Sequence, residues 1–352
     1  MQKLLIAAAA LAAIATIAPV QAANDDPVLN IYSARGEATD EALYNDFIKQ
    51  SGIAVNRSEN DSATTLESLK NEGKESKADV VLLDGLANLH DAESSGLFRP
   101  VHSDALNEAI PESLRAKPAE NGGTAWFGLA RRARIIVYDP DQIDAADVSS
   151  YEQLADEKNQ GRLCLAPLTD AANLVLVAAL IEHDGSDQAS SWLEDVARNL
   201  ATPPAGSDTD QIRAVAAGRC GVTLAGHFYL ARLMRADNAP DRDIADSVAV
   251  VFPNQDSWGT HMDVAGAAVA RHAPHADQAV RFLEYLVSEQ GQNLYANSND
   301  EWPIVAKYKF DNDALEELLG EHKDFKADRT PLSQIASHLD EARKLTDSVA
   351  FK

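Results

Sequence analysis

The chain has 352 residues, and 55 Asp and Glu against 31 Lys and Arg give it a formal net charge of −24 at pH 7. So acidic a surface repels phosphates, which argues against binding to nucleic acid, whereas a metal cation or a basic ligand is compatible with it. The length favours two domains with separate cores.

Residues 1–22 are predicted to be a cleavable signal peptide. Lys3 precedes an apolar run that extends to about Ala18, and the segment closes on the small-x-small pattern VQA. The apolar run is shorter than the roughly 20 residues of a membrane span, although an uncleaved anchor is the alternative. We therefore expect an exported protein of the bacterial periplasm that begins near Ala23.

Predicted strands and helices alternate in the first part of the mature chain. Apolar patterns predict strands at 26–33, 53–59 and 78–84, with helices at 39–52 and 62–73 between them. This alternation favours a mainly parallel α/β sheet, in which ligands bind beyond the carboxyl ends of the strands.

Charged side chains follow these three strands and are the first candidates for a binding site. Glu37, Glu59 and Asp84 could offer hard oxygen ligands to a metal ion, or they are solvated acids of an acidic protein. Arg35 could bind an anion or orient a carboxylate. Tyr32, close by, is expected to pack in the strand or line a cleft wall.

Two long β runs are predicted at 124–139 and 248–271. In the first, Arg132 and Arg134 alternate with apolar residues, so both point to one face, where they could hold an anion or form salt bridges between domains. In the second, His261 is expected to have a structural hydrogen-bonding role.

These two runs divide the chain into discontinuous lobes. Lobe 1 is expected to comprise 27–130 plus 250–297, and lobe 2 to comprise 131–249 plus 298–352. Two strands that pass between two α/β lobes form a hinge with a cleft beside it, and hinge closure around a ligand follows from that arrangement.

The chain contains two cysteines, Cys164 and Cys220, each in a short apolar stretch. In an oxidising compartment an even number of cysteines predicts a disulfide, which could contribute about 3–4 kcal/mol; two free buried thiols are the alternative. The spacing is not CxxC, so neither a zinc site nor a redox motif is indicated. GxSxG, HExxH and P-loop motifs are also missing from the sequence, which argues against an enzyme.

Several segments, in this order and spacing, resemble the periplasmic ferric-iron-binding proteins of ABC transporters, within the family 1 extracellular solute-binding proteins. They are IYSARGEATDEALYNDFIKQSGI, KADVVLLD, WFGLARRARIIVYD, YEQLADEKNQGRL, GSDTDQIRAVAAG, FPNQDSWGTHMDVAGAAVA and RFLEYLVSEQGQNLYANSNDEWPI. The resemblance implies a two-lobe type II periplasmic binding fold of the Venus-flytrap kind. Each lobe would be a mainly parallel sheet flanked by helices, and two crossing strands would join the lobes.

The same resemblance implies binding of Fe³⁺ through hard oxygen donors, with tyrosine phenolates at the centre. The adjacent tyrosine pair of that family falls on Phe228-Tyr229, in the stretch GHFYL, so only its second member is present. A further tyrosine falls on Ala172, and a His-Tyr pair falls on Gly36-Glu37.

We therefore expect a divergent ligand set for Fe³⁺, with a synergistic anion such as carbonate. The expected metal ligands are Tyr229, His227, Glu37 and Asp84. The expected anion-binding residues are Arg35, Arg132 and Arg134.

The first hypothesis for function is capture of ferric iron and its delivery by a monomer to the permease and ATPase of an ABC importer in the inner membrane. The alternative keeps the transporter but changes the ligand to a small anion, an organophosphate or a chelated metal. A third hypothesis is a sensor that signals to a membrane partner. Arginines that enter the cleft without carboxylate partners would favour an anion; arginines neutralised by carboxylates would favour a metal.

Overall fold

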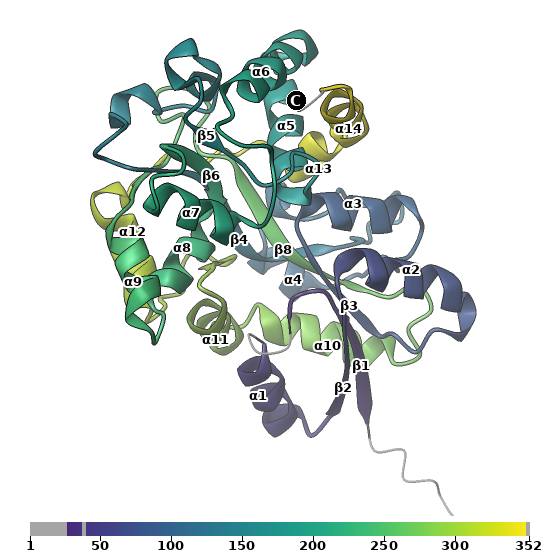
Figure 1. Cartoon of the computed structure of the whole chain (residues 1–352). Helices are drawn as coiled ribbons and strands as arrows, with labels where there is room; N and C mark the ends of the chain where they lie inside the picture. The colour runs from purple at the N-terminus through teal and green to yellow at the C-terminus, as the bar shows by residue number, and fades with distance from the viewer. Residues whose placement is uncertain (1–26, 37–39, 350–352) are drawn as a thin grey trace, which may run out of the picture.

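The computed structural model describes residues 27–36 and 40–349, which form an α/β protein of two lobes (Figure 1). Two long strands, β4 (Phe127–Tyr138) and β8 (Met262–Val269), run through the middle of the molecule and join the lobes. The α/β class and the two crossing strands agree with the sequence-based prediction. The predicted signal peptide, 1–22, lies outside the described residues.

The first lobe, at the lower right of Figure 1, is built on the three predicted strands. β1 (Val28–Ser33), β2 (Ala54–Glu59) and β3 (Val80–Asp84) are parallel and lie in the order β2-β1-β3, followed by the antiparallel β8. β3 lies between β1 and β8 and is buried from Val80 to Leu83, as is typical of an inner strand whose sheet is covered on both faces. The helices of this lobe are α1 (Glu41–Ser51), α2 (Ser62–Glu72), α3 (Leu86–Ser94), α4 (Asp104–Ala109), α10 (Ala276–Leu286) and α11 (Glu289–Asn299).

Strand β4 changes partner halfway along its length. Its residues 127–133 pair with β8, whereas its residues 134–138 pair with β6 (Val222–Gly226) and β7 (Ala249–Val251). The short strand β9 (Trp302–Pro303) pairs with β4 at Ala130 and Arg131. The chain therefore passes from one lobe to the other at Ala133-Arg134, next to the predicted site arginines.

The second lobe, in the upper part of Figure 1, has a smaller sheet and more helix. β5 (Leu163–Cys164) lies parallel to β6, and β6 is antiparallel to β4. The helices are α5 (Ala171–Asp184), α6 (Ser186–Asn199), α7 (Asp208–Ala216), α8 (His227–Met234) and α9 (Ala239–Asp246), joined by α12 (Asp313–Leu319), α13 (Leu332–Ala336) and α14 (Leu339–Ser348). Helix α5 is buried almost throughout, because α3, α6, α13 and α14 all contact it.

The strand pairing differs from the predicted lobe boundaries at two points. Residues 302–303 were expected in lobe 2, yet β9 pairs with the first-lobe half of β4. Residues 250 onward were expected in lobe 1, yet β7 pairs with the second-lobe half of β4. The return to the first lobe comes later, between Thr260 and Met262, where β8 begins. The end of the chain also contacts both lobes, since α14 packs on α5 while Arg343 forms an ion pair of 2.8 Å with Asp91 of α3.

Residues 275–297 follow one amphipathic pattern that is typical of a single helix, but the structure contains two helices there, α10 and α11. The break occurs at Val287-Ser288, where the Ser288 hydroxyl accepts a hydrogen bond from the backbone N–H of Gly291 and begins the second helix. A Cβ atom at Gly291 would lie 2.3 Å from the carbonyl oxygen of Tyr285, so the close approach of the two helices requires glycine here.

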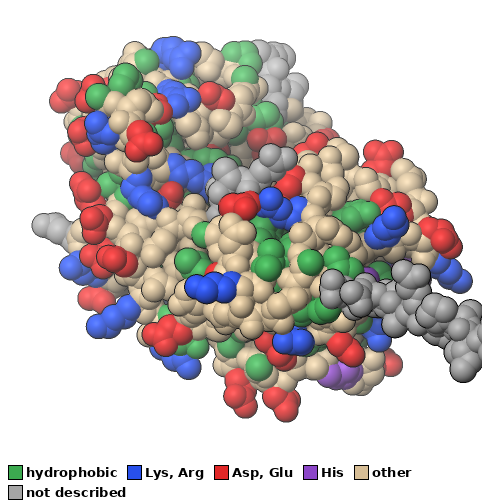
Figure 2. Space-filling model, turned by 90° about the horizontal axis from the view of Figure 1, so that it is seen from below, with side chains coloured by type: hydrophobic (Ala, Val, Ile, Leu, Met, Phe, Trp, Pro, Cys, Tyr) green, Lys and Arg blue, Asp and Glu red, His purple; other side chains and the backbone are tan. Residues whose placement is uncertain are grey.

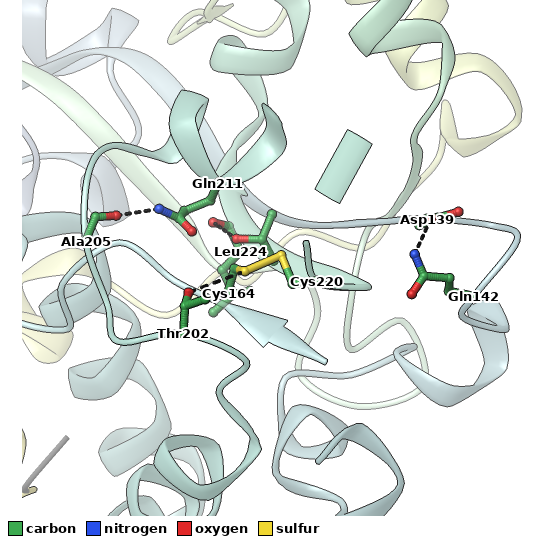
Figure 3. Close-up of a disulfide and its surroundings, with 9 residues drawn as sticks. Asp139, Gln142, Cys164, Thr202, Ala205, Gln211, Cys220 and Leu224 are labelled. Carbon is green, nitrogen blue, oxygen red and sulfur yellow. Dashed lines mark hydrogen bonds between the residues drawn. A yellow bond between two sulfur atoms is a disulfide. The ribbon is translucent and has the colours of Figure 1, made fainter. Parts of the chain in front are cut away.

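The predicted disulfide is present between Cys164 of β5 and Cys220, just before β6 (Figure 3). Their Cα atoms are 5.9 Å apart, and the bridge closes a loop of 56 residues. The chain-entropy model gives such a loop about 4 kcal/mol of stabilisation. The bridge fixes β5 beside β6, whose carboxyl end leads to the stretch GHFYL.

On the face seen in Figure 2, acidic and basic side chains are interspersed and do not gather into one large patch of a single sign. No helix in residues 27–36 and 40–349 is both long and apolar enough to cross a membrane.

Candidate functional site

A cavity of about 220 Å³ lies between the lobes, at the point where the crossing strands pass from one to the other. The first lobe contributes Asp84, Gly85 and Asn88, and the crossing segments contribute Arg132, Ala133, Arg134, His261 and Asp263. The second lobe contributes Asp170, Ala171, Ala172, Asn173, Ser207, Asp208, Gly226, Phe228 and Tyr229. The carboxyl ends of β3 and β6 and the first residues of α5, α7 and α8 therefore meet here, as expected for an α/β protein.

Asp84 is held in place by the turn from β3 into α3. The carboxylate of Asp263, on β8, accepts a hydrogen bond of 2.8 Å from the backbone N–H of Leu86. Gly85 has a φ of +80°, and a Cβ atom there would approach Asp263 Oδ2 to 3.0 Å. Both the positive φ and the lack of space favour glycine after Asp84. Burial raises the pKa of Asp263, and its hydrogen bonds to the backbone oppose that effect.

Arg35 and Arg132 share two carboxylates on the first-lobe side of the cavity. Oδ1 of Asp84 accepts hydrogen bonds from Arg132 at 2.8 Å and from Arg35 at 3.2 Å. Oε1 of Glu301 accepts one from Arg132 at 2.6 Å and lies 3.6 Å from Arg35. Complete burial raises the pKa of Glu301, but the charges of Arg132 and Arg35 lower it by more. The pKa of Glu301 is therefore below its ordinary value, and its carboxylate stays ionised.

Arg35 lies behind this wall and does not line the cavity. Its side chain is 1% exposed, and it also donates to Asp40 at 3.1 Å and to the side chain of Asn299 at 3.1 Å. The ring of Tyr295 lies 4.7 Å below the guanidinium. Arg35 therefore holds the acids of the first lobe together and does not reach the cavity itself.

Arg134 plays the corresponding part on the second-lobe side. It is paired with Asp208 and donates to the side-chain oxygen of Asn173 at 2.6 Å. Asp208 also accepts a hydrogen bond of 2.8 Å from the backbone N–H of Gly226. Within the described part of the chain, the buried Nε atoms of Arg132 and Arg134 have no hydrogen-bond partner, although both residues line the cavity.

Tyr229 lines the cavity from α8 and is partly buried. Burial raises the pKa of its phenol, and the negative charges of Asp208 and Asp84 raise it further. The phenol therefore needs a cation nearby before it ionises at neutral pH. Two guanidinium groups lie over the ring of its neighbour Phe228, that of Arg132 at 4.7 Å and that of Arg232 at 4.9 Å from the ring centre. A Cβ atom at Gly226 would lie 2.6 Å from this ring, which explains glycine at the start of GHFYL.

His227 does not lie in the cavity, contrary to what a ligand requires. Its imidazole is completely buried, stacks on Trp302 at 3.8 Å between ring centres, and accepts a hydrogen bond of 3.1 Å from the backbone N–H of Ala133. Burial lowers its pKa well below 6.5, and Arg132 lowers it further. Because residues two apart on a helix point about 200° away from each other, Tyr229 faces the cavity while His227 faces the core.

Glu37 lies outside the described residues, so its predicted role as a ligand stays a prediction. Glu59 and Tyr32 are not among the residues that line the cavity. The phenol of Tyr32 donates instead to Glu72, at 2.9 Å.

Six polar residues of the cavity wall were not among the predicted site residues: Asn88, Asp170, Asn173, Ser207, Asp208 and Asp263. The two second-lobe acids come directly before or at the start of α5 and α7, and polar residues at such positions are an ordinary capping signal, so they did not stand out. Burial raises the pKa of Asp170, and the charge of Asp208 raises it further.

His261 also lines the cavity, with 1% of its surface exposed. Burial lowers its pKa to about 4, and its imidazole is therefore neutral at physiological pH. Its backbone N–H donates to the hydroxyl of Tyr151, which in turn donates to the carbonyl of Arg134. No residue in 27–36 or 40–349 hydrogen-bonds to either ring nitrogen, so the expected structural role rests on the backbone and not on the ring.

Residues 42–317 match a family described as bacterial extracellular solute-binding proteins. The chain belongs to this family. It is 37% identical to iron uptake protein A1 of Synechocystis over 92% of this chain and 87% of the relative, and 25% identical to the Fe(3+)-binding periplasmic protein of Serratia marcescens over 79% of each. A Trichodesmium protein solved with iron and citrate ligands is 38% identical, with a TM-score of 0.85 over 92% of this chain and 100% of that one. The two-lobe type II fold predicted from the sequence is thereby confirmed.

Among the described residues, no three His, Cys, Asp or Glu side chains are grouped closely enough to hold a metal ion. A metal ion in the cleft would therefore depend on Tyr229, on movement of the lobes, or on a ligand from solution.

Proposed function

We propose that this protein is the substrate-binding component of an ABC importer, and that it captures ferric iron in the cleft between its lobes and delivers it to a membrane permease. The observation that carries this proposal is that Tyr229 of the second lobe and Asp84 of the first lobe line one cavity beside the hinge strands. Similar proteins are named for iron uptake and Fe(3+) binding, and the Trichodesmium structure contains iron with citrate.

The chemistry of the donors agrees with this cargo. Fe³⁺ is a strong Lewis acid that favours anionic oxygen, so it can displace the proton of the Tyr229 phenol even though the surrounding acids raise its pKa. Asp84, with its side chain 41% exposed, is the ligand of the first lobe that would meet the ion as the lobes close. Closure is favoured to the extent that iron binds the closed form more tightly than the open form.

An accompanying anion would complete the coordination of the ion. The Nε–H groups of Arg132 and Arg134 border the cavity without a protein partner in the described chain, and they suit a carboxylate or carbonate oxygen. Iron carried with a small carboxylate chelator would fill positions where Ala172 and Phe228 offer no donor.

The arginines decide between a metal and a free anion as the cargo. Arg132 is neutralised by Asp84 and Glu301, and Arg134 by Asp208. With their charges matched by carboxylates, the wall offers little net attraction for an anion alone, which disfavours the alternative of an importer for small anions or organophosphates.

We further propose that the protein acts in the periplasm as a monomer, after removal of residues 1–22, and that it binds and releases its cargo without catalysis. The support is the pattern of the N-terminal sequence, the solute-binding family, and the relative from Serratia that is named a periplasmic protein.

The test is a titration of the mature protein with ferric citrate, followed by visible absorption, in wild type and Tyr229→Phe. We expect a phenolate-to-iron charge-transfer band that saturates at one equivalent in wild type and is lost in Tyr229→Phe, while the melting temperatures of the two apo proteins stay close. If wild type develops no band and retains no iron after desalting, the proposal is wrong.

A further inference from the structure

We propose that Asp170 is a second anionic iron ligand of the second lobe, beside Tyr229. This inference rests on the proposed function, since it concerns the same cleft and the same ion. Asp170 and Ala172 both line the cavity, two residues apart, at the start of α5.

Asp170 is the one acid of the described cavity wall whose carboxylate is not already engaged. Asp84 is bonded to Arg35 and Arg132, Asp208 to Arg134 and the N–H of Gly226, and Asp263 to the N–H groups of Leu86 and Val264. The carboxylate of Asp170 makes no hydrogen bond and no ion pair with any residue that the structure describes, and the residue is exposed to solvent. It is therefore available to a ligand from solution without breaking an existing contact.

The position of Asp170 on its helix supports this role. It is the N-cap residue of α5, with φ −64° and ψ 143°, and an aspartate there ordinarily accepts a hydrogen bond from a backbone N–H of the first turn. Here the side chain forms no such cap, whereas Ser207 at the start of the neighbouring α7 does. The next two residues, Ala171 and Ala172, have small side chains that leave the space beside the carboxylate open.

A second observation indicates that the cavity takes a polar ligand. His261 lines the same cavity, and only 1% of the residue is exposed. Neither ring nitrogen has a hydrogen-bond partner in the described chain. The buried Nε atoms of Arg132 and Arg134 are in the same state. Buried polar atoms usually have partners, so groups left without one around a cavity point to a ligand with polar atoms.

The chemistry assigns different tasks to the two lobes. Tyr229 and Asp170 both belong to the second lobe, so they can hold the ion while the cleft is open. Together they would supply two negative oxygen donors to Fe³⁺, which prefers them to neutral donors. Asp84 then adds a first-lobe oxygen as the lobes close.

The experiment compares Asp170→Asn with wild type in the mature protein, using ferric citrate for absorption and competition with nitrilotriacetate for affinity. Even the partners of metal ligands change affinity about 10- to 100-fold, so we expect loss of a direct ligand to weaken iron binding at least about tenfold. The charge-transfer band of Tyr229 should move to longer wavelength, because an iron with one anionic donor fewer accepts charge more readily. Asp170→Glu should recover part of the affinity.

Asp104→Asn is the matched control, because it also removes an exposed acid from the first turn of a helix but lies outside the cavity. Its iron affinity and band should equal those of wild type. Asp170→Asn with wild-type affinity and an unmoved band would overturn the inference while leaving the proposed function intact. If wild type itself binds no iron, the proposed function fails first. If Asp170→Asn melts well below wild type, the test uses Asp170→Glu instead. A charge-transfer band in Asp170→Glu at the same wavelength as in wild type would then also overturn the inference.

Discussion

The two walls of the cleft use their charged residues differently. On the first-lobe side, Asp84 and Glu301 are fixed by Arg35 and Arg132 in a network that is mostly buried. On the second-lobe side, Arg134 pairs with Asp208 in a similar way, and Arg232 lies over the ring of Tyr229. Asp170, however, makes no hydrogen bond or ion pair with a residue that the structure describes. We therefore expect the first wall to contribute mainly to rigidity beside the hinge, and the second wall to offer the proposed ligands Tyr229 and Asp170. Substitutions in the first wall should therefore mainly lower the free energy of unfolding, and substitutions in the second wall should mainly lower the affinity for iron.

The largest effect on stability is expected for Glu301→Gln. Its carboxylate is fully buried and serves two buried guanidinium groups, and breaking such a network costs about 3–5 kcal/mol. Denaturant unfolding of the apo protein measures the change. Glu317→Gln, on an exposed position of α12, is the control and should change the free energy of unfolding by less than about 0.5 kcal/mol. A mutant as stable as the control would show that this wall is not structural.

The same network should respond to acid. Because the pKa of Glu301 is lower in the folded protein than its ordinary value of 4.5, its stabilising effect is complete above pH 4.5 and is lost as the pH falls through the folded pKa. As the pH is lowered below 4.5, the free energy of unfolding should therefore fall more in wild type than in Glu301→Gln.

A smaller effect on stability is expected for His227→Phe, which keeps the ring stacked on Trp302 but removes the acceptor for the N–H of Ala133. A buried N–H without a partner costs about 1–3 kcal/mol. Iron affinity should stay within about twofold of wild type, since the imidazole does not reach the cavity. A loss of iron binding with unchanged stability would restore His227 as a ligand.

His227→Phe should also flatten the pH dependence of stability. In the wild type, burial keeps the pKa of the folded imidazole below 6.5, so the unfolded chain takes up the proton more readily. Stability is therefore complete above pH 6.5 and falls as the pH drops below that value. The variant lacks this contribution, and unfolding curves at pH 7.5 and pH 5.5 would show a smaller difference between them than in wild type.

The smallest effect is expected for Asp84→Asn. Its side chain is 41% exposed, and partly exposed ion pairs contribute about 1 kcal/mol at most. Iron affinity should fall less than in Asp170→Asn, because Asp84 already shares its charge with two arginines. If Asp84→Asn weakens iron binding more than Asp170→Asn does, the assignment of ligands to the second wall and rigidity to the first wall must be reversed.

Local patterns predicted much of the fold correctly. The strands 28–33, 54–59 and 80–84 stand where alternating or continuous apolar residues indicated them, and the two cysteines form the expected bridge. The break between α10 and α11 does not follow from the apolar pattern, because both helices continue one amphipathic pattern. Only the capping bond of Ser288 and the close packing of Gly291 separate them.

The sequence indicated some of the residues that line the cavity. Tyr229, Asp84, Arg132 and Arg134 do line the cavity, because the end of a strand or a crossing run marks such positions in the sequence. The sequence does not show whether His227 and Asp170 face the cavity, because the direction of a side chain at the first turn of a helix depends on where that helix begins. A shift of two residues turns a side chain by about 200° and exchanges the core face for the cleft face.

The sequence by itself determined the α/β class, the two crossing strands and the disulfide, because these depend on apolar periodicity and on covalent chemistry that neighbouring residues carry. The tertiary structure alone decided which charged side chains form ion pairs within the protein and which can contact a ligand. Asp84 meets Arg132 across 48 residues and Arg132 meets Glu301 across 169, so their neutralisation depends on contacts that no local pattern encodes.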